Sequence, residues 1–110
     1  MKEQFTRIDT SGKFYYSDKE MTVFHREDGP AYERASGHKA WYTNGKLHRE
    51  DGPAIERADG SKVWFINDKR HREDGPAAEY ADGSKVWYIK GVELTEEEFN
   101  DRDRVEVTLD

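Results

Sequence analysis

The chain has 110 residues, of which 38% are charged and 34% are hydrophobic, and it contains no cysteine. This length predicts one small domain, and the lack of cysteine excludes disulfides and thiolate metal sites and fits a reducing cytosol. The first residues hold no apolar run and no stretch approaches the roughly 20 apolar residues of a membrane span, so we expect a cytoplasmic protein with no secretory signal and no membrane partner.

The formal net charge of −6 belongs to the segment 93–110, which holds eight acidic and two basic residues. The rest of the chain carries sixteen residues of each sign. A neutral body lacks the basic surface that phosphate binding requires, so we expect no direct contact with nucleic acid.

Residues 1–24 predict a degenerate N-terminal cap. The segment from Lys13 to Phe24 is similar to a later repeat unit with an insertion, and Phe5 and Ile8 indicate a further strand. Stacked repeats require such atypical ends.

Three repeats follow within residues 25–91. The heptapeptide His-Arg-Glu-Asp-Gly-Pro-Ala begins at His25, His48 and His71, so its copies repeat with a period of 23 residues. A fixed period in this range is typical of repeat architectures. Within a unit, β-branched and aromatic residues between Asp-Gly and Asn-Gly turn signals predict a hairpin.

The middle unit shows the predicted hairpin most clearly, with a short strand from Ala54 to Ala58 and a longer strand from Lys62 to Ile66. An even number of strands lets every copy dock in the same direction, so we expect two strands per unit. The heptapeptide then serves as a connector, in which proline starts the next strand.

Stacking such units predicts a mainly β fold, an elongated single-layer antiparallel sheet whose equivalent residues form ladders about 10 Å apart. Alternate residues point to opposite faces. One face is expected to carry Trp41, Trp64 and Trp87. The other face is expected to carry Tyr42, Phe65 and Tyr88.

Residues 92–110 predict a C-terminal cap and an acidic tail. Thr95 is a candidate N-cap and Glu98 completes a capping box, so we expect a short helix from Glu96 to about Arg102 that covers the sheet edge. The alternation of Val105, Val107 and Leu109 predicts a final strand.

The units resemble the MORN-like repeats of bacteria and their phages, including the YwqK-type antitoxin-like proteins. The matching residues run from Trp41 to His48 and continue from Arg49 to Ala54, with their copies, over roughly residues 12 to 99. The resemblance implies an elongated β-hairpin array that serves as an interaction scaffold. It also implies a phage-type accessory protein that acts on host proteins.

The heptapeptide also contains residue types found in metal and catalytic sites. Imidazoles about 10 Å apart cannot share one ion whose nitrogen ligands lie about 2 Å from the metal, so we expect no metal and no cofactor. A His–carboxylate pair suits acid–base catalysis, but three equal copies on a thin sheet differ from one concave active site, so we expect no enzyme.

We therefore expect structural roles for the heptapeptide and for the tryptophan ladder. The aspartates are expected to accept turn amides, the arginines to pair with carboxylates of neighbouring units, and the imidazoles to pack on aromatic rings. This structural set comprises His25, His48, His71, Asp28, Asp51, Asp74, Trp41, Trp64 and Trp87.

The predicted function is non-catalytic protein binding, with inhibition of a host enzyme or defence complex as its purpose. The expected docking surface combines the aromatic ladder Tyr42, Phe65 and Tyr88 with the carboxylate ladder Glu33, Glu56 and Glu79. One alternative is an acidic nucleic-acid mimic that uses the segment from Glu93 to Asp103, and another is a small hydrolase with a His–carboxylate pair. Self-association through an edge strand stays open as well.

Overall fold

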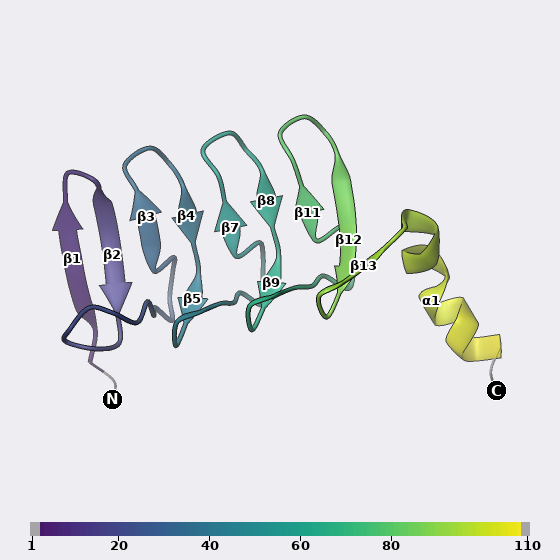
Figure 1. The fold of residues 1–110 in the computed structure, drawn as a ribbon, viewed down its shortest axis with the longest axis horizontal. Helices are drawn as coiled ribbons and strands as arrows, with labels where there is room; N and C mark the ends of the chain where they lie inside the picture. Colours follow the sequence, from purple (N-terminus) through teal and green to yellow (C-terminus); the bar gives the residue numbers. More distant parts are fainter. Residues whose placement is uncertain (1–2, 109–110) are drawn as a thin grey trace.

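The computed structural model describes the backbone of residues 3–108 and the side chains of residues 3–102. The molecule is elongated and mainly β, with principal extents of 53 × 35 × 18 Å and one C-terminal helix (Figure 1). The predicted fold class is confirmed. Within residues 3–108, no helix has the length and apolar character needed to cross a membrane.

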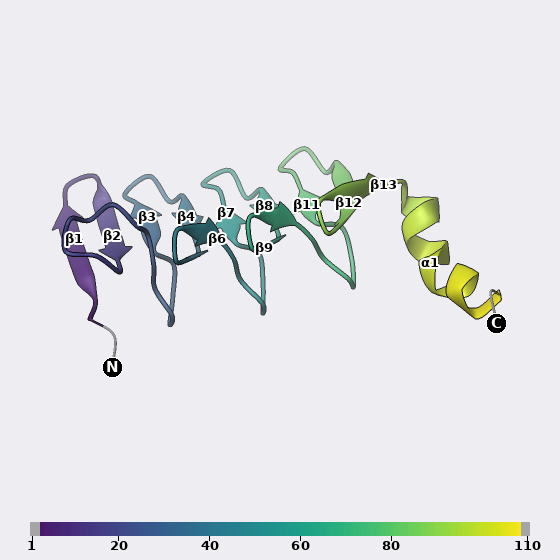
Figure 2. The same ribbon diagram turned by 60° about the horizontal axis from the view of Figure 1, so that its bottom comes forward.

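Nine strands form one open antiparallel sheet, and two separate two-stranded hairpins lie below it (Figures 1 and 2). The sheet order is β1 (Phe5–Asp9), β2 (Gly12–Tyr16), β3 (Tyr32–Arg34), β4 (Lys39–Ala40), β7 (Ile55–Glu56), β8 (Lys62–Val63), β11 (Ala78–Glu79), β12 (Lys85–Ile89) and β13 (Val92–Leu94). The hairpins are β5 (Tyr42–Thr43) with β6 (Lys46–Leu47) and β9 (Phe65–Ile66) with β10 (Lys69–Arg70).

The first two units each contribute two strands to the sheet, β3 and β4 and then β7 and β8, as the sequence predicts. The longer strand breaks at its tryptophan: the amides of Trp41 and Trp64 donate to the carbonyls of Ala54 and Ala77 in the next unit, at 2.8 and 2.7 Å. Beyond the break the chain forms a second hairpin, which the sequence analysis missed. Its return strand is only two residues long, Lys69–Arg70 in the middle unit, and therefore shows no alternation.

The turns of the two lower hairpins and the turn between β12 and β13 have positive φ at both central residues, which is the geometry of a type I′ turn. The φ values are 51° and 80° at Asn44 and Gly45, 49° and 68° at Asn67 and Asp68, and 51° and 83° at Lys90 and Gly91. This confirms the tight-turn prediction for the Asn-Gly pair. Asp68 replaces glycine in the middle unit, and its carboxylate accepts the amide of Leu47 at 2.7 Å.

The sheet register creates two rows of opposite character on neighbouring positions. Lysine and glutamate alternate across successive strands in the row Lys13, Glu33, Lys39, Glu56, Lys62, Glu79 and Lys85. The adjacent row is apolar: Phe14, Tyr32, Ala40, Ile55, Val63, Ala78 and Val86. A slip of one residue would exchange the two rows, so together they specify the register.

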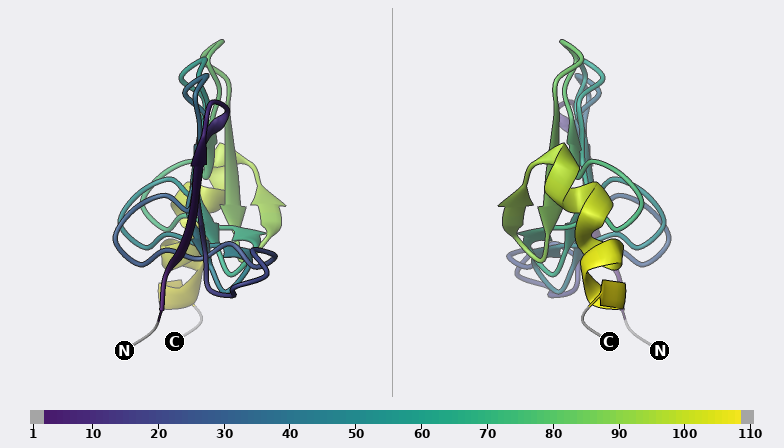
Figure 3. Two further views of the ribbon diagram at one scale, coloured as in Figure 1. Left: turned by 90° about the vertical axis from the view of Figure 1, so that its left-hand side faces the viewer. Right: turned by 90° about the vertical axis from the view of Figure 1, so that its right-hand side faces the viewer.

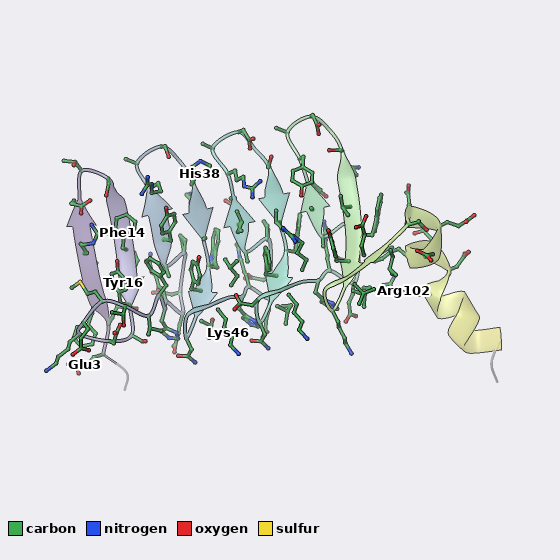
Figure 4. The ribbon with its side chains drawn as sticks, in the orientation of Figure 1. Glu3, Phe14, Tyr16, His38, Lys46 and Arg102 are labelled. Atoms are coloured by element: carbon green, nitrogen blue, oxygen red, sulfur yellow. The ribbon has the colours of Figure 1, made fainter. Side chains whose placement is uncertain are left out.

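The core lies along the apolar row and continues below it. Val63 and Phe65 are 1% and 8% exposed, and the small side chains of Ala54 and Ala78 pack in the same buried cluster. At the N-terminal end, Phe14 and Tyr16 of β2 are buried (Figure 4), and Phe24 stacks on Tyr16 with ring centroids 5.0 Å apart. Aromatic rings therefore supply much of the burial in a thin molecule.

The helix α1 (Glu96–Thr108) begins as predicted and ends later than predicted. The Thr95 hydroxyl accepts the Glu98 amide at 3.0 Å, and the Glu98 carboxylate accepts the Thr95 amide at 2.8 Å, which completes the capping box. The predicted end near Arg102 and the predicted strand through Val105 and Val107 are wrong, because helix growth from an established first turn is favourable. Leu109 lies outside the described residues.

Candidate functional site

The three heptapeptides form connector loops, defined here as residues 25–30, 48–53 and 71–76. Figure 3 shows these loops projecting from one side of the thin sheet, whereas the lower hairpins project from the other side. The loops recur once per unit along the long axis of the molecule (Figure 2). They therefore present the same residues repeatedly on a single face, which we call the connector-loop face.

An arginine organises each connector loop. In the middle loop, Arg49 donates from Nε to the Asp51 carboxylate at 3.1 Å and from Nη1 to the Pro53 carbonyl at 3.0 Å. Its guanidinium stacks over the Trp41 ring at 3.9 Å and reaches the Glu56 carboxylate at 3.4 Å. Arg26 and Arg72 make the corresponding contacts, with Tyr15 in place of the tryptophan in the first loop.

The aspartates of the loops have a partner different from the one predicted. Asp28, Asp51 and Asp74 accept the Nε–H of the arginine two residues earlier. The glycine that follows each aspartate leaves room for this arginine: a Cβ on Gly52 would lie 2.9 Å from the guanidinium carbon of Arg49. The loop is thus closed by an arginine that folds back over a glycine.

The histidines accept the turn amides. Nδ1 of His48 accepts the backbone amide of Asn67 at 3.1 Å, and His25 and His71 accept the amides of Asn44 and Lys90 at 2.9 Å. Because Nδ1 accepts, the ring proton of the neutral imidazole is on Nε2. Each Nε2 faces a glutamate of the same loop at 3.5, 3.3 and 3.2 Å, namely Glu27, Glu50 and Glu73.

Each imidazole therefore fastens the connector loop that begins a unit to the type I′ turn that closes the same unit. This role differs from the predicted packing on aromatic rings. Among the described side chains, no three His, Asp or Glu residues come together in a way that would hold a metal ion. The histidine of the heptapeptide joins the two ends of each unit in this structure.

Two open grooves lie between successive connector loops, with volumes of about 820 and 770 Å³. The tryptophans Trp41 and Trp64 contribute to their linings, and loop residues line them on both sides. Each groove lining contains two arginines and four carboxylates, and the carboxylates stand at the solvent-exposed loop tips. The grooves are accordingly acidic at the rim, and each contains an arginine stacked on a tryptophan.

The predicted docking surface does not exist as one surface. Glu33 belongs to the charged row, whereas Tyr32 belongs to the apolar row, and Phe24 contacts the rings of both Tyr32 and Tyr42 at 5.6 and 5.1 Å. The carboxylate ladder (Glu33, Glu56 and Glu79) and the aromatic ladder (Tyr42, Phe65 and Tyr88) are therefore on opposite faces.

The aromatic ladder also contributes to the core. Phe65 is 8% exposed and packs in the buried cluster. Burial raises the pKa of the Tyr42 hydroxyl, and the Asp68 carboxylate adds to the effect. A phenylalanine with so little exposed surface has little to offer a partner.

The grooves between the loops were not predicted, because the heptapeptides were interpreted as simple connectors. The sequence does contain a signal for them: a charged heptapeptide repeats without change, and a tryptophan repeats with the same period. Its interpretation required the side on which the loops project, which the repeat alone does not give. Comparison of the chain with protein-family models, with curated proteins and with solved structures found no match.

Proposed function

We propose that this chain is a non-catalytic protein-binding repeat module and that the connector-loop face is its contact surface. The observation that carries the proposal is the regular presentation of one Arg–carboxylate–aromatic arrangement, three times along a single face. Aromatic and arginine side chains are the usual anchors of protein interfaces. The two grooves between the loops offer concave surface for a partner.

The contacts of the histidines support a binding module over a hydrolase. In all three loops the imidazole makes the same two contacts, with a turn amide and with a loop glutamate. Acid–base catalysis requires one imidazole placed against a substrate in an enclosed site. A role that three histidines share equally is better explained as structural than as catalytic.

A biological setting can be added to the proposed binding role. We propose a phage-type accessory protein of the MORN-like group that inhibits a host enzyme or defence complex in the bacterial cytoplasm. Its support is the resemblance of the heptapeptide and its flanking segments to MORN-like repeats. The stacked hairpins of the fold agree with that resemblance.

Capture of a partner followed by matched variants tests the contact surface. The tagged full chain is used to isolate a binding protein from bacterial lysate, and the purified pair is then measured by calorimetry. Glu27→Gln, Glu50→Gln and Glu73→Gln together remove charge from the loop tips while keeping an oxygen acceptor opposite each imidazole. We expect at least a tenfold loss of affinity with an unchanged melting temperature.

The control variant changes the opposite side of the sheet. Lys46→Gln with Lys69→Gln alters the exposed lower hairpins and removes charge without touching the loops. This control is expected to bind like the original chain. Loss of binding in the control alone, or in neither variant, would refute the connector-loop face as the contact surface.

A further inference from the structure

The first strand of the sheet, β1, has a free edge. It stands at the end of the strand order, and among residues 3–108 it pairs with β2 alone (Figure 1). The amide of Tyr15 in β2 donates to the carbonyl of Ala31, and its carbonyl accepts the amide of His25, so both backbone groups point away from β1. Opposite residues in an antiparallel pair exchange both hydrogen bonds or neither. The backbone groups of Thr6, which is opposite Tyr15, and of Ile8 therefore face outward along the free edge.

The side chains of β1 interrupt the two rows of the sheet. Ile8 is opposite Lys13 and takes the end of the charged row, although it is apolar and 65% exposed. Arg7 is opposite Phe14 and takes the end of the apolar row, where its guanidinium stacks over the ring at 4.2 Å. Natural sheets usually place a charge at an outward edge position, because an apolar edge invites another strand to pair. Ile8 lacks this protection.

The two charges of β1 have opposite signs and stand two residues apart. Arg7 and Asp9 are on the same face and form an ion pair within the strand, with 46% and 39% of their side chains exposed. A second β1 strand that runs antiparallel meets both charges with their opposites in one register. Charges that repel other strands therefore favour a second copy of this chain.

Three symmetric registers align the outward-facing backbone groups of two β1 strands. Pairing Thr6 with Thr6 leaves Ile8 opposite Gln4. Pairing Thr6 with Ile8 places the two Arg7 residues against each other, which is repulsive. Pairing Ile8 with Ile8 places each Arg7 opposite Asp9 of the second copy. This last register joins the two isoleucines on one face and makes two pairs of opposite charge on the other.

The directions of the strands disfavour a head-to-tail stack of copies. Neighbouring strands are antiparallel throughout the nine-stranded sheet, so β1 and β13 run in the same direction. An equally oriented copy would therefore place β13 parallel to β1, and parallel pairing is less stable per residue. The helix α1 also packs against β13. Two β1 edges related by a two-fold axis instead form an antiparallel pair.

We infer that the chain forms a weak symmetric dimer through β1, with Ile8 opposite Ile8 and each Arg7 opposite Asp9 of the second copy. The two-fold axis is perpendicular to the sheet, so the connector-loop faces of both copies point to the same side. A strand pair of this length buries less than the roughly 1,000 Å² of a stable interface, so the dimer forms only at high protein concentration. The inference goes beyond the proposed binding function and does not depend on it.

Disulfide trapping tests the register in the full chain, which contains no cysteine. The variants Thr6→Cys, Arg7→Cys and Ile8→Cys each place one thiol on β1, and Arg57→Cys places one at an exposed position outside this strand. In the proposed register the two Cα atoms at position 8 are about 5.5 Å apart, which suits a disulfide. The pairs at positions 6 and 7 are about 8 Å apart or more, which is too far.

We expect Ile8→Cys to form disulfide-linked dimers at least tenfold faster than the other three variants in a glutathione buffer, as measured on non-reducing gels. Equal rates in all four variants would indicate random collision and overturn the inference. Fastest crosslinking at Thr6→Cys or Arg7→Cys would identify another register and also overturn it. A mixture of Ile8→Cys with Val92→Cys that gives mainly the mixed dimer would show contact between β1 and β13, which is equally incompatible with the inference.

Charge variants in the Ile8→Cys background test the ion pairs. Arg7→Glu and Asp9→Lys each place like charges opposite each other and are expected to slow crosslinking at least fivefold. A one-to-one mixture of the two variants restores opposite charges, so the mixed dimer should be the main product. Each substitution changes the net charge of −6 by two, so both chains stay negative and overall attraction does not explain such a result. The control Arg57→Glu also lies two residues before an aspartate and is expected to have no effect.

A mixture that crosslinks no faster than the separate variants would refute the pairing of Arg7 with Asp9. Circular dichroism shows whether each charge variant is folded. The Ile8→Cys chain keeps both original charges, so the cysteine scan decides the register even if Asp9→Lys does not fold. Neutralisation of the loop tips concerns a different surface, so the dimer and the proposed binding function succeed or fail separately.

Discussion

The backbone amide of Asn67 donates to Nδ1 of His48, a residue 19 positions earlier in the chain, at 3.1 Å. This bond joins the connector loop of one unit to the type I′ turn that closes the same unit's lower hairpin. Because the same bond forms at His25 and His71, it is a repeated joint of the array. The bond lies within one unit, so it holds the loop and the closing turn of each repeat together.

Replacing His48 with phenylalanine keeps a ring of similar shape and removes the acceptor of the Asn67 amide. We expect a loss of roughly 1–3 kcal/mol in the free energy of unfolding, because the amide is left without its partner. Urea denaturation followed by tryptophan fluorescence measures the loss. His38→Phe is the control, since its Nδ1 accepts the Ala58 amide at a longer 3.4 Å on an exposed turn. Equal losses in the two variants would contradict the joint.

Replacing Gly52 with alanine is expected to displace the Arg49 side chain. The added Cβ would lie 2.9 Å from the guanidinium carbon, so the contacts of Arg49 with Asp51 and Pro53 must shift. We expect a destabilisation of about 1 kcal/mol, comparable to one hydrogen bond. In the Arg49→Ala background the same glycine change should cost little, which a double-mutant cycle measures. Additive effects would show that Gly52 is needed for another reason.

The sequence predicted the repeat, the strand count in the sheet and the helix start, because each has a local signal. Asn44 with Gly45 and Thr95 with Glu98 are examples, since their residue types determine the backbone within one turn. The lower hairpins, the histidine joint and the separation of Glu33 from Tyr42 were not predicted. They depend on contacts about 20 residues apart and on the breaks at Trp41 and Trp64. Short polar strands give no periodic pattern that would predict them.

Replacing Lys62 with glutamate places three carboxylates side by side on neighbouring strands. Lys62 is paired with Glu56 on one side and with Glu79 on the other. Like charges directly opposite each other destabilise a sheet by roughly 0.2–1 kcal/mol per pair, so we expect a loss of up to about 2 kcal/mol at low salt. Urea denaturation at low and high salt should show the loss shrinking as screening increases.

The control for the charged row is Lys69→Glu, which reverses an exposed charge on a lower hairpin whose cross-strand partner is Ile66. It is expected to change the free energy of unfolding by less than about 0.5 kcal/mol, as for ordinary surface substitutions. A loss as large as that of Lys62→Glu, or a salt-independent loss at Lys62, would show that the alternating row does not stabilise the register.

Two turn aspartates, Asp59 and Asp82, make the free energy of unfolding depend on pH. The amide of Ser61 donates to the Asp59 carboxylate at 2.8 Å and lowers the pKa of that carboxyl, while the hydroxyl and amide of Ser84 lower the pKa of Asp82. Both pKa values are below the ordinary 3.8 of the unfolded chain. The stabilisation is therefore complete above the unfolded pKa and is lost as the pH falls through the lower pKa of the folded state.

Asp59→Asn with Asp82→Asn removes the two charges and keeps an oxygen acceptor at each turn. Near neutral pH the variant is expected to unfold at a lower urea concentration than the original chain, because hydrogen bonds to a charged acceptor are stronger. Below about pH 4 the difference should shrink, since protonated carboxyls in the original chain also give neutral acceptors. Unfolding midpoints measured from neutral pH down to about pH 2 test this. A difference that stays constant over the range, or grows as the pH falls, would show that these carboxylates do not stabilise the turns.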